Sequence, residues 1–201
     1  MKKLLVYFSV LVGCLFIGLT TYYFVKDYDE FIISRGDETG VFADNSYNLN
    51  VGETATLKVE VNKQSDDTEV LYSFETDGVA TYDLETGVIT AVKGGTTKLK
   101  IYSNKESLGF FEYDIAVGDG SDTNGWFIRN KEDLKAIGTG SMDLSNNYEL
   151  IADIDLENEE WAPIGGNINE LDQIEYFVGK FNGNQHTIKN LTMTTDGYYA
   201  G

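Results

Sequence analysis

The sequence predicts an all-β protein with an N-terminal membrane helix. Three observations support this. A long uncharged apolar run opens the chain, short runs of β-branched and aromatic residues alternating with polar ones fill most of the remainder, and a helical pattern is confined to one short segment. A chain of 201 residues with 42% apolar and 13% aromatic residues can build one or two small cores.

The charge of the chain excludes nucleic acid as a partner. The sequence has 33 acidic and 15 basic residues, a net charge of −18, and Lys2, Lys3 and Lys26 flank the apolar run. The chain after Lys26 therefore carries 12 basic and 33 acidic residues. Binding of DNA or RNA requires Lys and Arg side chains that displace counterions, so this surface would repel a polyanion.

Residues 4–25 form a run of 22 positions without a charge. As a helix this run would be about 33 Å long, roughly the thickness of the hydrocarbon core. The aromatic residues 22–24 suit the interfacial belt, and Lys2 and Lys3 would stay in the cytoplasm. We therefore expect residues 1–26 to be a single-pass signal-anchor, with the bulk of the chain extracellular.

Two alternatives to the anchor remain open. A cleaved signal peptide would need a shorter apolar core and a small-residue cleavage site, and no convincing site follows the run. The segment Leu11-Val12-Gly13-Cys14 resembles a lipobox, in which Cys14 would be lipidated, although apolar sequence continues for eleven residues beyond it. Cys14 is the only cysteine, so disulfides within the chain are excluded. The part of the chain expected to be exported has no cysteine, which is typical of bacterial surface proteins.

After the anchor we expect a stalk or an irregular lead-in strand at residues 27–43. From Tyr47 the chain alternates with period two, and Leu57, Val59 and Val61 are on the apolar side. Turn dipeptides such as Asp77-Gly78 separate the runs that follow. This pattern predicts a β-sandwich, with further strands expected at residues 70–74, 79–82, 88–92, 96–102 and 110–117.

Residues 44–118 resemble the bacterial Ig-like domain, group 2. The resemblance rests on Leu49-x-Val51-Gly52-Glu53-Thr54, on Tyr72-Ser73-Phe74 and on Thr86-Gly87-Val88-Ile89-Thr90-Ala91-Val92. It implies a spacer or adhesive module without catalytic residues. Tyr72 occupies a position where that family often has Trp, so it is expected to fill the core.

The acidic stretch at residues 119–125 is expected to be a linker. An EF-hand loop with Gly125 at its sixth position would have Gly120 and Lys131 where two ligands are needed, so that type of calcium loop is excluded. A looser calcium site between the two modules remains open. A short helix is expected next, with Asn130 as its cap, Leu134 and Ile137 on one face and its end at Gly138. A strand is then expected at residues 148–156.

Residues 126–201 are similar to the GLUG-type repeat region of bacterial surface proteins. The resemblance rests on Trp161-Ala162-Pro163-Ile164-Gly165 and on the string from Phe177 to Leu191, where Asn182 replaces a common Asp. It implies the first coils of a right-handed parallel β-helix with a short capping helix. Because a coil buries its face only against neighbouring coils, we expect Gly201 to be a truncation point.

No catalytic, cofactor-binding or metal-binding residue is assigned from the sequence, and no cofactor is expected. His186 is the only histidine, so we interpret it as structural. Carboxylates are densest from Asp153 to Glu160 and are interpreted as a solvated face: Asp153, Asp155, Glu157, Glu159 and Glu160. A glycosidase dyad among the many carboxylates is not excluded.

The sequence therefore indicates a non-enzymatic, membrane-anchored bacterial surface protein. Its Ig-like module would act as a spacer or adhesive unit, and its β-helix would bind an unknown extracellular glycan or protein. The alternative is the N-terminal, non-catalytic part of a larger surface enzyme, such as an IgA-protease-like metallopeptidase or a polysaccharide-active β-helix protein. A His-Glu-x-x-His helix further along the polypeptide would favour the protease.

Overall fold

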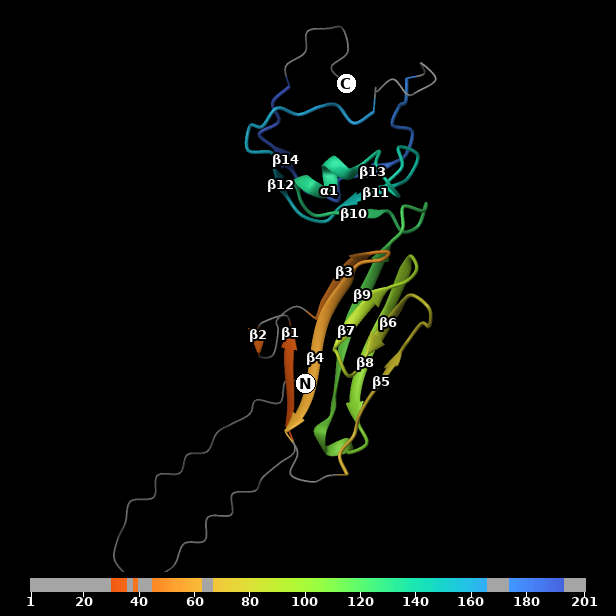
Figure 1. Cartoon of the computed structure of the whole chain (residues 1–201), viewed down its shortest axis with the longest axis vertical. Helices are drawn as coiled ribbons and strands as arrows, with labels where there is room; N and C mark the ends of the chain where they lie inside the picture. Colours follow the sequence, from red (N-terminus) through yellow and green to blue (C-terminus); the bar gives the residue numbers. More distant parts are fainter. Residues whose placement is uncertain (1–29, 36–37, 40–44, 63–66, 166–173, 194–201) are drawn as a thin grey trace, which may run out of the picture.

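The computed structural model describes residues 30–35, 38–39, 45–62, 67–165 and 174–193. Strands dominate these residues, joined by one short α-helix and one 3₁₀ turn, so the all-β prediction is confirmed (Figure 1). The membrane segment expected at residues 4–25, the alternative lipidation site Cys14 and the truncation expected at Gly201 lie outside them. No helix in the described part of the chain is long and apolar enough to cross a membrane.

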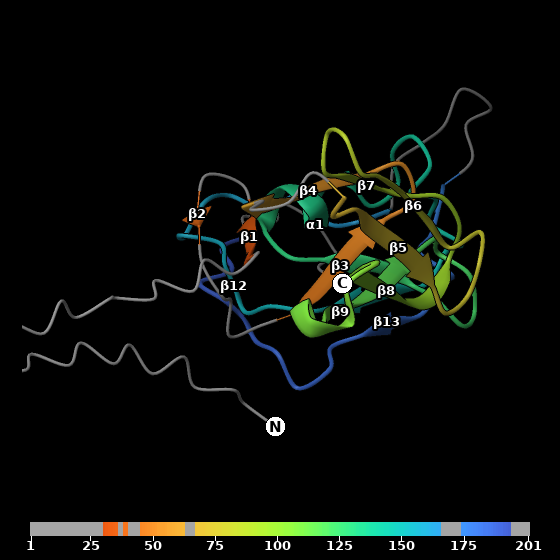
Figure 2. The same cartoon turned by 90° about the horizontal axis from the view of Figure 1, so that it is seen from below.

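The first half of the chain forms a five-stranded and a four-stranded sheet that face each other (Figures 1 and 2). The five-stranded sheet is antiparallel and has the order β2-β1-β4-β7-β6. The four-stranded sheet has the order β3-β9-β8-β5, and β3 runs parallel to β9. The bounds are β1 Glu30–Arg35, β2 Glu38–Thr39, β3 Ser46–Asn50, β4 Thr54–Asn62, β5 Val70–Phe74, β6 Ala80–Asp83, β7 Val88–Ala91, β8 Gly95–Ser103 and β9 Phe110–Gly118, with a 3₁₀ turn, η1, at Glu106–Leu108.

One apolar core lies between the two sheets. Leu57 and Ile89 come from the five-stranded sheet, and Leu99, Ile101 and Ile115 come from the four-stranded sheet; all five are fully buried. Period two places successive side chains on opposite faces of a strand. The alternation read from the sequence therefore placed Leu57 and Val59 correctly on the inner face.

Two expectations for this half need correction or refinement. Residues 30–35, expected within a stalk or an irregular lead-in strand, form a regular strand that pairs with β4 from Glu30↔Asn62 to Arg35↔Leu57. Tyr72, expected in the core, is 41% exposed, and that expectation was wrong. Its strand, β5, is at the edge of its sheet, so the ring is covered on one side by Tyr82, with ring centroids 5.2 Å apart.

The second half of the chain stacks short strands in parallel. β10 (Trp126–Ile128), β11 (Tyr148–Leu150) and β13 (Phe181–Asn182) form one ladder, and β12 (Ile154–Asp155) and β14 (Ile188–Lys189) form another. A parallel bridge between Glu160 and Thr192 continues this pairing. Side chains from these strands and from the segments beside them form a second apolar core: Trp126, Ile128, Leu134, Ile137, Tyr148, Leu150, Ile154, Leu156 and Trp161.

The short helix of this half is confirmed. The helix α1 spans Lys131–Ala136, and the side chain of Asn130 accepts a hydrogen bond from the Asp133 amide at 2.8 Å. This bond satisfies one of the amides that a helix leaves unpaired in its first turn. Leu134 and Ile137 are buried against the second core, so α1 covers it.

The single strand expected at residues 148–156 is two strands in the structure. The chain bends between β11 and β12, and Asp153 accepts a hydrogen bond from the Thr187 amide at 2.9 Å at this bend. Tyr148, Leu150, Ile154 and Leu156 are still buried on one side. A corner between two strands can preserve an alternating pattern, so the pattern alone did not reveal it.

Candidate functional site

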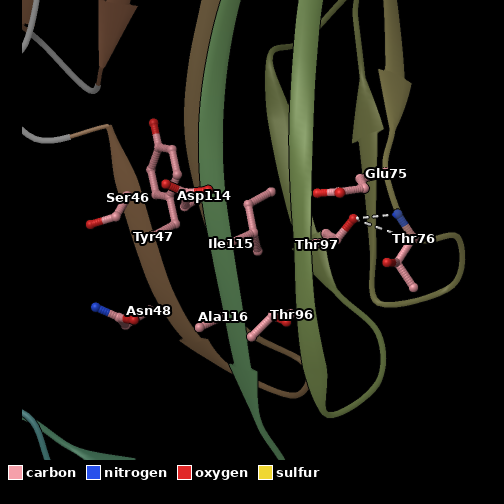
Figure 3. A pocket seen from close by; sticks show the side chains of 10 residues that line it. All are labelled: Ser46, Tyr47, Asn48, Glu75, Thr76, Thr96, Thr97, Asp114, Ile115 and Ala116. Carbon is pink, nitrogen blue, oxygen red and sulfur yellow. Dashed lines mark hydrogen bonds between the residues drawn. The ribbon is translucent and has the colours of Figure 1, made fainter.

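A polar groove of about 470 Å³ lies against the four-stranded sheet (Figure 3). It is formed where β3, β8 and β9 pass the loop that follows β5. Its lining mixes hydroxyl, carboxylate and amide groups with small apolar ones: Ser46, Tyr47, Asn48, Glu75, Thr76, Thr96, Thr97, Asp114, Ile115 and Ala116. These groups come from four separate stretches of the chain, which only the fold brings together.

One wall of the groove is fixed by Thr97. Its hydroxyl accepts a hydrogen bond from the Thr76 amide and donates one to the Thr76 carbonyl, both at 2.9 Å. Thr97 is buried on β8, whereas Thr76 belongs to the loop after β5. The pair of bonds therefore holds this loop against the sheet and keeps the groove in shape.

Lys98 offsets one of the two carboxylates at the groove. Asp114 accepts a hydrogen bond from the Lys98 ammonium at 2.7 Å, and this bond raises the pKa of Lys98 above its ordinary value. Glu75 is an exposed carboxylate on the opposite side (Figure 3). Hydroxyls, an amide and carboxylates can donate and accept hydrogen bonds with a hydroxyl-rich ligand. The lining contains no His or Cys, so a nucleophile activated by His cannot be assembled from it.

An apolar hollow of about 380 Å³ opens in the second half of the chain. It lies beside the last strands of the two ladders, β13 and β14, where Val178 is 73% exposed and Leu191 is 55% exposed. The hollow is lined almost entirely by apolar side chains: Leu134, Ile137, Leu156, Trp161, Pro163, Ile164, Phe177, Phe181, Ile188, Leu191 and Met193. This end of the stack therefore presents apolar side chains at the surface.

His186 and the carboxylates singled out in the sequence lie on the surface of the stacked strands. His186 Nδ1 lies 3.3 Å from Asp153 Oδ1. Asp155 accepts hydrogen bonds from the Glu157 amide at 2.9 Å and from the Asn190 side chain at 2.7 Å, which lower its pKa. These contacts connect the chain at β12 to the chain at β14.

Two further carboxylates of this stretch contact the start of α1. Glu157 and Glu159 both accept hydrogen bonds from Lys131, at 2.8 and 2.7 Å, and so connect the segment after β12 to the start of α1. In the linker, Asp122 accepts hydrogen bonds from Asn147 and Lys180. No group of three or more His, Cys, Asp or Glu side chains could hold a metal ion within the residues that the structure describes.

The two halves meet at a joint defined by Asn50, Glu53, Phe127, Arg129 and Asp133. The Asn50 side chain makes hydrogen bonds with both the main-chain N–H and the main-chain carbonyl of Phe127. Arg129 forms a bidentate ion pair with Glu53. Sequence reasoning missed this joint because its partners are up to 77 residues apart. By strand alternation alone, Asn50 belongs to the outer face with Ser46 and Asn48.

Comparison with known proteins gives limited information. No protein-family model matches the chain. Halomucin from Haloquadratum walsbyi (strain DSM 16790 / HBSQ001) is 27% identical over 176 residues, a match that covers 83% of this chain. The match covers only 2% of halomucin, so the chain corresponds to a small part of that protein's length.

Proposed function

We propose that this chain is a non-catalytic, membrane-anchored cell-surface protein of the bacterial type. An Ig-like module at residues 44–118 serves as spacer or adhesive unit, and the start of a right-handed parallel β-helix at residues 126–201 is presented beyond it. The observation that carries this proposal is the parallel stacking of β10, β11 and β13 directly on the end of the two-sheet module. The partial match to halomucin is compatible with a surface location.

The polar groove supports a glycan as the ligand. Its lining offers hydroxyl, amide and carboxylate groups, and the pairing of Lys98 with Asp114 leaves one further acidic side chain, Glu75, at the groove of a chain of net charge −18. A neutral, hydroxyl-rich ligand would match these groups without a charge penalty. A polyanionic ligand would be repelled.

Two measurements test this function. Antibody to residues 44–118 should label intact source cells, and absence of labelling without permeabilisation would contradict a surface location. On a glycan array, the full chain in detergent should bind at least one neutral glycan class, and Glu75→Gln with Asp114→Asn should weaken that binding. The matched control Glu85→Gln lies outside the groove and should bind as the natural chain does.

A second candidate is the N-terminal, non-catalytic part of a larger surface enzyme. The apolar hollow fits the longer polypeptide that this candidate requires, because a further coil stacked on β13 and β14 would cover Phe181 and Ile188. An immunoblot of source cells with the same antibody tests that requirement. A band far above 22.4 kDa would direct the search for activity to the additional sequence, whereas a band near 22.4 kDa would eliminate the larger enzyme.

A further inference from the structure

β10 is the first strand of its parallel ladder, so one of its edges has no neighbouring strand in the part of the chain that the structure describes. The Trp126 amide donates to the Asn147 carbonyl at 2.8 Å, and the Ile128 carbonyl accepts from the Ile151 amide at 3.0 Å. These residues therefore direct their main-chain groups toward β11. In a parallel ladder alternate residues face opposite sides, so the main-chain groups of Phe127 point to the free edge.

The side chain of Asn50 occupies that edge. The Phe127 amide donates to Asn50 Oδ1 at 2.8 Å, and Asn50 Nδ2 donates to the Phe127 carbonyl at 3.0 Å. Both hydrogen bonds are buried, and Asn50 itself is 6% exposed. A carboxamide has the same donor and acceptor as a peptide group, so Asn50 makes the two bonds that a neighbouring strand would make.

Two further contacts hold the joint in one geometry. Glu53, in the turn after β3, accepts hydrogen bonds from the main-chain N–H of Asn50 at 2.7 Å and from Arg129 Nη1 at 2.8 Å. Arg129 also donates from Nε to Asp133 in α1 at 2.9 Å, and these carboxylates raise the pKa of its guanidinium. The network therefore connects a turn of the first module to both β10 and α1.

The main chains also approach closely at this joint. A Cβ added at Gly118, the last residue of β9, would lie 2.4 Å from the Gly125 carbonyl oxygen and 2.9 Å from Asn50 Oδ1. No side chain fits there. The two halves are therefore closely packed here, and β3 and β9 end directly against the start of β10 (Figure 1).

We infer that the first module is the N-terminal cap of the parallel stack, with Asn50 closing the free edge of β10. An open strand edge is a template for pairing with another chain, and a closed edge is not. The cap therefore leaves the stack a single direction of growth, away from the first module. It also makes the two modules one rigid unit, and this inference does not depend on the ligand or on the proposed function.

Hydrogen exchange on the full 201-residue chain in detergent tests the cap. Asn50→Ala should speed amide exchange in β10 and β11 by about tenfold or more, because a buried pair of bonds is lost, and should leave the centre of β8 unchanged. Asn48→Ala, an exposed position two residues earlier on the same strand, is the matched control and should change neither. Equal acceleration in both modules, or none in β10 and β11, would overturn the inference.

A milder variant covers the case in which Asn50→Ala does not fold. Glu53→Gln retains the volume of the side chain and weakens its pairing with Arg129. Residual dipolar couplings should fit one alignment tensor for both modules in the natural chain and two tensors in this variant. Two independent tensors in the natural chain would show a flexible joint and refute the rigid unit.

Discussion

The hydroxyl of Tyr82 donates a buried hydrogen bond to the main-chain carbonyl of Leu57 at 2.7 Å. Tyr82 is on β6 and Leu57 is on β4, and the two strands flank β7 in the five-stranded sheet. The bond therefore links two strands that are not neighbours. Burial raises the pKa of the Tyr82 hydroxyl, which keeps it protonated as a donor over the whole physiological range.

Replacement of Tyr82 by Phe should lower the free energy of unfolding by about 1–3 kcal/mol, because the Leu57 carbonyl would be buried without its partner. Tyr102→Phe, on the outer face of β8, is the control and should change it by less than about 0.5 kcal/mol. Urea unfolding of both variants measures the difference. Equal losses in the two variants would show that the bond to Leu57 is not specifically stabilising.

Gly87 is required by a close approach of two main chains. A Cβ there would lie 2.7 Å from Lys58 Cα, and its φ of +74° is left-handed. Gly87→Ala should therefore cost about 3 kcal/mol or more, from steric overlap added to backbone strain. Gly78→Ala isolates the strain, because its φ is +81° and nothing lies within 4 Å of the added Cβ; it should cost about 1 kcal/mol. Thermal unfolding of both variants checks the ranking, and similar losses would contradict the overlap.

Local features of the fold were predictable from the sequence because their causes are local. Strand alternation identified Leu57 and Val59 as buried, and the cap at Asn130 identified the start of α1. Burial of Tyr72 was predicted wrongly because the sequence does not say which strand is at a sheet edge. Edge position depends on strand order, which is a long-range property.

The candidate site was not predictable for the same reason. The polar groove joins residues 46–48, 75–76, 96–97 and 114–116, which are ordinary strand and loop residues in the sequence. Asn50 lies at a position that alternation assigns to the outer face, yet it is buried and its side chain is hydrogen-bonded to Phe127 of the second half. Such sites are created by the meeting of distant segments and leave no periodic signal.

The stacked strands should lose stability in alkali through Tyr148. Its hydroxyl donates to the Asp143 carbonyl at 2.6 Å, and burial, followed by the charge of Asp143, raises the pKa of Tyr148 to about 12. The unfolded phenol titrates near 10. The folded state therefore favours the neutral form, so this contribution is complete below pH 10 and disappears as the pH rises from about 10 to about 12.

Urea unfolding of the natural chain and of Tyr148→Phe across this range tests the contribution of Tyr148. The difference in free energy of unfolding between the two proteins should shrink as the pH rises above 10. Because Tyr82 is retained in both, its own titration cancels in the comparison. A difference that stays constant up to pH 12 would exclude Tyr148 as the source.

Asn190, directly after β14, has two features whose contributions to stability can be separated. Its φ of +58° is in the left-handed region, and its side chain donates to Asp155 Oδ1 at 2.7 Å. Asn190→Ala should lose both features, with about 1 kcal/mol from backbone strain alone. Asn190→Gly keeps the permitted backbone and loses only the side-chain bond, so it should be less destabilised. Urea unfolding at neutral pH measures both, and equal losses would show that strain plays no part.

The Asn190 bond to Asp155 should also weaken in acid. The Glu157 amide first and the Asn190 side chain second lower the pKa of Asp155 below its value in the unfolded chain. A carboxyl with a lowered folded pKa stabilises the fold above the unfolded pKa, and that contribution is lost as the pH falls through the folded pKa. The stability gap between the natural chain and Asn190→Gly should therefore narrow below about pH 4. An unchanged gap at acid pH would show that Asn190 contributes independently of the charge on Asp155.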